Sequence, residues 1–165
     1  MAGPTTGSLR SSTGKPPVEA VTGIATGTFK FGSSAFKLTK EFELQGGAIY
    51  FEGYIDEIVT LATGGATTDT TATIPSGAFE VTVATRVTTT ITTAANFSVG
   101  ISGAATRFLA ASTNITAGDT NSGAATANAY TSATNIRITA NATPGAGAVR
   151  VTAWIRGIRA ATSST

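Results

Sequence analysis

Apolar and polar residues alternate along two long stretches of the chain, residues 48–62 and 79–93. Successive side chains of a β-strand point to opposite faces, so this alternation predicts two strands, each with one buried and one wet face. In the first stretch, the residues expected to face inward are Ile49, Phe51, Ile55, Val59 and Leu61. In the second stretch, they are Phe79, Val81, Val83, Val87 and Ile91.

Shorter apolar segments follow, separated by clusters of turn-forming residues. They predict strands at residues 97–101, 107–109, 135–139 and 149–158. Polar, turn-rich loops are expected at residues 63–73 and 113–129. In the last strand, the residues expected to face solvent are Arg150, Thr152, Trp154 and Arg156. Short strands between turns, with no long helix, predict an all-β fold, a β-sandwich or jelly-roll-like domain.

The N-terminal part of the chain has a different pattern. Residues 1–17 are rich in Gly, Pro, Thr and Ser and have almost no apolar side chains, which is typical of an extended arm. From Phe29 onward, Phe and Leu recur at mostly even spacing, which predicts extended segments that bury one face against another surface. We therefore expect an N-terminal arm with apolar anchors, residues 1–45, before a β-sandwich domain, residues 46–165.

Composition agrees with the pattern and excludes several kinds of chemistry. Only 12% of the residues are charged and 7% are aromatic, and Thr is abundant, a residue that favours pleated surfaces. The chain contains no His and no Cys. These absences remove the commonest general base, the thiolate nucleophile and the commonest zinc ligands. We expect neither enzymatic activity nor a metal or cofactor.

The charges form blocks of alternating sign. Residues 1–40 are mainly basic, residues 41–80 carry acidic but no basic side chains, and residues 81–165 are again mainly basic. Such blocks allow neighbouring copies to meet with opposite charges. They are also consistent with solvated faces on separate strands.

Two groups of charged residues are candidates for a site. The densest carboxylates are Glu52, Asp56 and Glu57, but Glu52 and Asp56 stand roughly 13 Å apart along a strand, too far for a glycosidase pair. We expect a solvated acidic face there. A cationic stripe for polyanions is conceivable on the predicted polar faces that carry Arg86, Arg107, Arg137 and Arg150. The chain lacks the interleaved aromatic residues of single-strand binders, so no nucleic-acid partner is expected.

Several Thr-, Gly- and Val-rich stretches resemble a known family. They are residues 59–69, 83–92, 96–100, 106–108, 115–120 and 148–154. Together they resemble a small β domain of tailed-bacteriophage structural proteins, which occurs in capsid decoration (cement) proteins, head fibres and the tips of tail fibres. The resemblance covers about residues 59–158. It brings no catalytic or ligand-binding residue with it.

The resemblance implies a non-enzymatic virion protein that decorates and stabilises the phage head as a trimer. Its expected place is the capsid surface, with the major capsid protein as partner and no membrane. The chain has no heptads for a coiled-coil stalk and no collagen-like repeat, which favours decoration over a fibre. The alternative is a receptor- or glycan-binding knob of a head or tail fibre. A knob needs an aromatic-lined pocket, for which the candidates are Tyr50, Tyr54, Tyr130 and Trp154.

Apolar and aromatic side chains on outward strand positions leave more apolar surface than a monomer usually exposes. We therefore expect a homotrimer whose interface includes part of residues 48–62. With the Phe anchors of the arm, the expected interface residues are Phe29, Phe31, Phe36, Phe42, Tyr50, Tyr54, Ile58 and Trp154.

Overall fold

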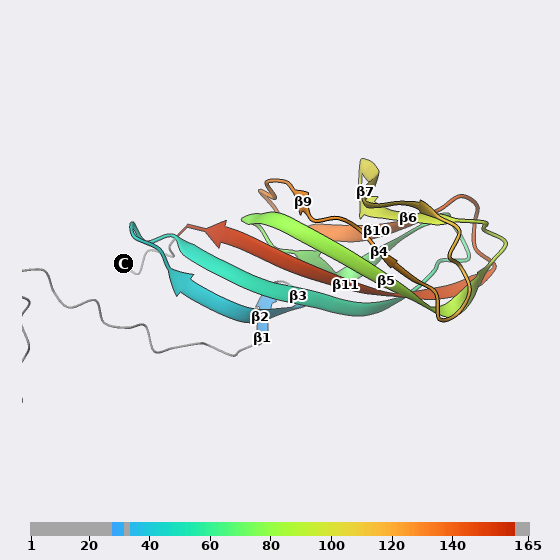
Figure 1. The fold of residues 1–165 in the computed structure, drawn as a ribbon, viewed down its shortest axis with the longest axis horizontal. Coiled ribbons are helices and arrows are strands. Elements are labelled where there is room, and N and C mark those ends of the chain that lie inside the picture. The colour runs from blue at the N-terminus through green and yellow to red at the C-terminus, as the bar shows by residue number, and fades with distance from the viewer. Residues whose placement is uncertain (1–27, 32–33, 161–165) are drawn as a thin grey trace, which may run out of the picture.

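A computed structural model describes residues 28–31 and 34–160, with side chains from residue 36 onward. Residues 1–27 of the predicted arm, which spans residues 1–45, lie outside the described residues. The described chain folds into antiparallel β-strands without helices (Figure 1). The large sheet follows the order β1 (Thr28–Phe31), β2 (Ser34–Glu43), β3 (Ile49–Thr60), β11 (Ala146–Arg159), β5 (Ala78–Thr92) and β8 (Thr120–Ser122), and β9 (Thr126–Ala127) also pairs with β5. The small sheet follows the order β4 (Thr67–Ile74), β10 (Thr134–Ala140), β6 (Phe97–Ile101) and β7 (Ala104–Ser112).

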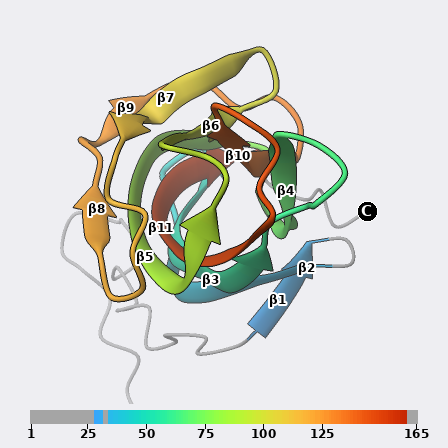
Figure 2. The ribbon, with the colours of Figure 1, turned by 90° about the vertical axis from the view of Figure 1, so that its right-hand side faces the viewer.

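The two sheets pack face to face, which confirms the predicted all-β sandwich. Seen from one end, the large sheet is curved, and the strands β4, β10, β6 and β7 of the small sheet lie across from it (Figure 2). The core between them contains most of the inward side chains that the alternation predicted, Ile49 and Phe79 excepted, together with side chains from the small sheet. Fully buried examples are Phe51, Ile55, Val81, Val83, Val87, Phe97, Val99, Ile136, Ile138, Val149, Val151 and Ile155.

Strand β11 is the central strand of the large sheet. It pairs with β3 from Ala148 to Arg159 and with β5 from Ala146 to Gly157. Its alternation is as predicted, with Val149, Val151, Ala153 and Ile155 buried and the residues between them turned outward. The side opposite the core, formed by outward residues of β2, β3, β11 and β5, is called the outer face below.

The alternation fails at the start of β5. Phe79 was expected to face inward, but its side chain is 38% exposed, and Ala78 is buried instead. The ladder between β5 and β11 shifts between the pairs Arg156–Glu80 and Gly157–Ala78, so Phe79 is an extra residue on β5. A β-bulge of this kind reverses which residues face the core on its far side. The prediction for Phe79 is therefore wrong.

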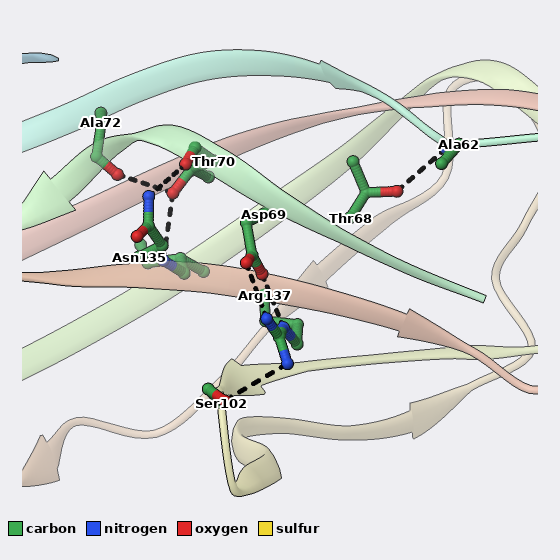
Figure 3. A network of polar contacts seen from close by, with 9 residues as sticks. Ala62, Thr68, Asp69, Thr70, Ala72, Ser102, Asn135 and Arg137 are labelled. Atoms are coloured by element: carbon green, nitrogen blue, oxygen red, sulfur yellow. Dashed lines mark hydrogen bonds and ion pairs between the residues drawn. The ribbon is translucent and has the colours of Figure 1, made fainter. Parts of the chain in front are cut away.

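The polar loop predicted at residues 63–73 is also wrong, because most of it forms strand β4. Within the predicted loop its buried residues are Thr70, at 2% exposure, and Ala72, and β4 ends on the buried Ile74. The Thr70 hydroxyl donates to the Ala72 carbonyl and accepts from the Ile136 amide, while the Asn135 side chain donates to the Thr70 carbonyl (Figure 3). Because hydrogen bonds satisfy the buried Thr70, this strand lacks the alternation of apolar and polar residues by which the other strands were predicted. Strands β8 and β9 likewise interrupt the turn-rich stretch 113–129.

Glu57 connects β3 of the large sheet to β4, an edge strand of the small sheet. It lies on the inward side of β3 and is half-buried. Its carboxylate oxygens accept hydrogen bonds from the backbone amides of Thr71 and Ala72 in β4, each at 2.8 Å. The expectation of a solvated carboxylate is therefore wrong for Glu57. A charge-assisted pair of hydrogen bonds occupies backbone donors that an open edge strand would otherwise present.

Glycines in the large sheet make room for aromatic rings. Phe51 lies directly opposite Gly157 in the β3–β11 ladder, and a methyl group added to Gly157 would overlap the Phe51 ring. Phe36 of β2 fills the corresponding space at Gly53, and the Phe36 and Phe51 rings meet edge to face at 5.9 Å. Phe36 is completely buried, so β2 contributes to the core of the sandwich.

We predict that Gly157→Ala destabilises the fold, because the added methyl group overlaps the Phe51 ring. Overpacking of a core costs about 1–3 kcal/mol of the free energy of unfolding, which urea denaturation measures. The control is Gly64→Ala in the loop after β3, where an added methyl group meets nothing within 4 Å. Equal free energies of unfolding for the two variants would contradict this packing.

Candidate interaction surface on the large sheet

The structure gathers most of the expected interface residues on the outer face. Tyr54 and Trp154 are directly opposite each other on β3 and β11, with ring centroids 5.2 Å apart. Ile58 lies four residues further along β3, on the same side of the strand. Trp154 is 56% exposed and Ile58 is 58% exposed, which is unusual for large apolar side chains at the centre of a sheet.

A second aromatic group lies toward the other end of the outer face. The Tyr50 ring is 4.9 Å from the Phe42 ring and 6.4 Å from the Phe79 ring, centroid to centroid. Ile158, paired with Tyr50 in the ladder, is 43% exposed. The sequence interpretation included neither Phe79 nor Ile158 among the interface residues. Shared parity with Trp154 could have identified Ile158, but the bulge hides the outward position of Phe79.

Lysines from β2 lie over these rings. The Lys37 ammonium is 5.2 Å from the centre of the Tyr54 ring, and the Lys40 ammonium is 5.4 Å from the centre of the Phe42 ring. Cation–π contacts at exposed positions contribute modestly, about 0.5–1 kcal/mol. They hold basic side chains close to the aromatic groups.

Ion pairs between β3, β11 and β5 neutralise much of the charge of the outer face. Arg150 donates to both carboxylate oxygens of Asp56, and the Thr152 hydroxyl donates to the same carboxylate at 3.1 Å. The hydrogen bond from Arg150 is the main cause that lowers the pKa of Asp56. Arg156 bridges Glu52 at 3.4 Å and Glu80 at 3.3 Å.

Tyr50 is part of this polar network. Its hydroxyl donates to the Glu52 carboxylate. Desolvation by burial raises the pKa of Tyr50 to about 12, and the hydrogen bond to Glu52 is the second cause of this rise. Tyr50 is therefore neutral at physiological pH and acts as a hydrogen-bond donor.

Two open hollows lie on or beside the outer face. One, of about 290 Å³, lies beside Trp154 and is bordered by Glu52, Glu80, Thr82 and Arg156. The other, of about 300 Å³, lies between β5, β8 and β11. Open hollows of this size suit a protein surface or a single polar group better than an enclosed small-molecule site.

The other expected residues lie elsewhere. Phe36 is in the core, and Phe29 and Phe31 belong to β1, whose side chains lie outside the described part. Tyr130, a candidate for a glycan pocket, is buried at 4% exposure and cannot line a surface pocket.

The arginines considered for a cationic stripe are not brought together. Arg137 belongs to the small sheet, where it pairs with Asp69 and donates to Ser102 (Figure 3). Arg107 is on β7. Arg86 and Arg150 alone of this set are neighbours, directly opposite each other on β5 and β11.

Within the described ranges, no three acidic side chains gather as metal ligands would. No helix in this part of the chain is long and apolar enough to cross a membrane.

The chain has a distant structural neighbour in a phage capsid. That neighbour is a chain of the cyanophage Pam1 capsid asymmetric unit, with a TM-score of 0.49 and 22% sequence identity over 70% of this chain and 89% of that one. No protein-family model and no curated protein matches the chain. A likeness at this level assigns neither a family nor a function.

The Asp56–Arg150 pair predicts a pH-dependent contribution to stability. The pKa of Asp56 is lowered in the folded chain from its ordinary value of 3.8. The pair therefore stabilises the fold above that pH, and this stabilisation is lost as the pH falls through the lower folded value. We expect Asp56→Asn to reduce the free energy of unfolding at about pH 6 and to change it little at about pH 2.

The control is the same substitution in an Arg150→Gln background, which isolates the pair as a double-mutant cycle. Denaturant titrations across the pH range measure both series. If the pH-dependent loss persists undiminished without Arg150, the guanidinium is not the partner that stabilises ionised Asp56.

Proposed function

We propose that the chain is a non-enzymatic virion structural protein, a capsid decoration (cement) protein that stabilises a phage head as a homotrimer. The observation that carries this proposal is the outer face, an aromatic and apolar surface on a sandwich whose core is already complete. Trp154, Ile58 and Ile158 contribute nothing to that core. Their exposure needs another explanation, and burial against a partner supplies it.

The chemistry of the outer face supports a protein partner. Aromatic side chains are enriched at protein interfaces, where unpaired charges are costly. On the outer face, Asp56 is already neutralised by Arg150, and Glu80 has Arg156 as partner. A partner can therefore cover the Tyr54–Trp154 group without leaving these charges unpaired.

In this proposal the contacts between protomers are made by Phe42, Tyr50, Tyr54, Ile58 and Trp154. We leave Phe36 out because it fills the core. Phe29 and Phe31 stay as proposed anchors, together with the N-terminal arm, for fastening the sandwich to the major capsid protein. Since Phe36 and Leu38 are buried in the core, a truncation that tests the arm has to end before β2.

The strand order supports the proposal that the sandwich is a jelly roll. Beyond β2, the order β3–β11–β5–β8 lies opposite the order β4–β10–β6–β7. A jelly roll is a double sheet of eight strands built from Greek keys. The proposed virion role also rests on the sequence resemblance over about residues 59–158, which spans most of these strands.

A glycan-binding knob is the second candidate, and the hollow beside Trp154 favours it. An exposed indole offers a flat apolar surface, while Glu52, Glu80, Thr82 and Arg156 offer hydrogen-bond acceptors and donors around it. In a knob, Trp154 stays exposed in the free protein. In the decoration protein, it is covered by a neighbouring protomer.

We predict that Trp154→Glu converts the trimer to a monomer, because it places a carboxylate inside the proposed interface. The loss of a central Trp weakens association by at least about 30-fold, as expected for a hot spot. Size-exclusion chromatography with light scattering measures the mass, and the matched control is Thr106→Glu, at an exposed position of β7 in the small sheet. A wild-type chain that is monomeric at micromolar concentration would refute the proposed trimer.

The decoration role is tested with particles that lack the chain. We expect added wild-type chain and Thr106→Glu to bind these particles and raise their thermal stability, and Trp154→Glu to do so much less. Binding to host glycans, lost in Trp154→Glu, by a chain that leaves particle stability unchanged would favour the knob instead.

A further inference from the structure

Arg86 and Arg150 occupy directly opposed positions on β5 and β11 and both project from the outer face. Like charges in such cross-strand pairs are destabilising. Arg150 is compensated by Asp56, which it contacts through Nε at 2.7 Å and through Nη2. Arg86 forms no ion pair with any described residue, so its positive charge is uncompensated at this point of the sheet.

A hollow of about 300 Å³ lies at this arginine pair. Thr120 and Ser122 of β8 line it, opposite Arg86 and Ala84 respectively in the β5–β8 ladder, and Thr152 lines it from β11. The hydroxyls of Thr120 and Ser122 make no hydrogen bond to other described residues. The hollow therefore offers a guanidinium and hydroxyl donors that the fold itself does not use.

We propose that this hollow binds a single oxyanion group, a carboxylate, sulfate or phosphate. Arg86 supplies the net positive charge, because Arg150 and Asp56 cancel each other. The N–H groups of Arg150 that Asp56 does not occupy, and the hydroxyls of Thr120 and Ser122, complete the donor set. Guanidinium groups are well suited to oxyanions because their planar donors match the geometry of the oxygen atoms.

The hollow has one uncompensated positive charge, that of Arg86, so it suits a ligand with one anionic group. Arg107 and Arg137 lie on the small sheet, so no row of cations extends from Arg86 for a polyanion to follow. The neighbouring hollow beside Trp154 has the opposite balance, with Glu52 and Glu80 around Arg156. The source of the group is either a free inorganic ion or the carboxylate of an acidic sugar. This inference is argued from the hollow and not from the proposed capsid role. Arg150 pairs with Ile58 of the proposed trimer contact, so the Trp154→Glu variant is titrated beside the wild-type chain to separate cover by a neighbouring protomer from loss of the site.

The test is a titration of the full chain with inorganic phosphate and, separately, with methyl glucuronide, at constant ionic strength maintained with chloride. Amide shifts of β8 in nitrogen–proton NMR spectra report occupancy of the hollow. We expect saturable shifts confined to β8 and its neighbours on β5 and β11. Neutral methyl glucoside is the ligand control.

The decisive variant is Arg86→Gln, which should weaken binding by about tenfold or more, as expected for loss of a charged donor. It also removes the like-charge pair, so the fold should be retained. Arg86→Lys keeps the charge without the planar fork and should retain part of the affinity. Arg137→Gln, at an ion-paired arginine on the small sheet, is the matched control and should bind as the wild type does.

The site is supported if either probe binds and Arg86→Gln weakens that binding. Which of the two probes binds, phosphate or the glucuronide, identifies the source of the oxyanion. Shifts that do not saturate, that occur equally with methyl glucoside, or that are the same in Arg86→Gln overturn the proposal.

Discussion

The central position of β11 between β3 and β5 is the constraint on which the rest of the structure depends. Pairing on both sides leaves this strand no free edge, and its inward Val149, Val151, Ala153 and Ile155 anchor the core. Because side chains alternate, burying those residues forces the intervening ones outward. Trp154 and the cationic Arg150 and Arg156 therefore project together from the middle of the large sheet.

The outer face combines features that a solvated strand surface does not need. Rings from β2, β3 and β11 lie against one another, and ion pairs lie between them. Carboxylates from β3 and β5 hold the arginines of β11 in place, which keeps the surface ordered before any partner arrives. A preorganised surface loses less side-chain entropy on binding than a flexible one. This is the physical basis for the proposal that the outer face binds a partner.

The strands with strict alternation could be predicted from the sequence, and so could the common side of Tyr50, Tyr54, Ile58 and Trp154. Their parity alone determines which face they share. The predictions fail where a bulge interrupts the alternation, or where the inward and outward residues of a strand do not differ in polarity. The bulge at Phe79 is a register shift that only pairing with β11 defines. Strand β4 was missed because its buried Thr70 is satisfied by hydrogen bonds instead of apolar packing.

Other features depend on contacts between residues far apart in sequence. The sequence alone does not distinguish Glu57 from other acidic residues, because its hydrogen-bond partners lie on β4. Phe36 looked like an anchor for a partner surface, but the space above Gly53 places it in the core. The opposition of Arg86 and Arg150 likewise follows from the β5–β11 register, which the local pattern does not contain.

The central claim is that the outer face is buried between copies of the chain on a phage head. Electron cryo-microscopy of the particle with the chain bound tests it most directly. The account predicts trimers in which Trp154 and Ile58 of each protomer are covered by a neighbouring protomer. Density in which these side chains face solvent in a bound trimer, or in which the chain is attached as a monomer through another surface, would contradict it.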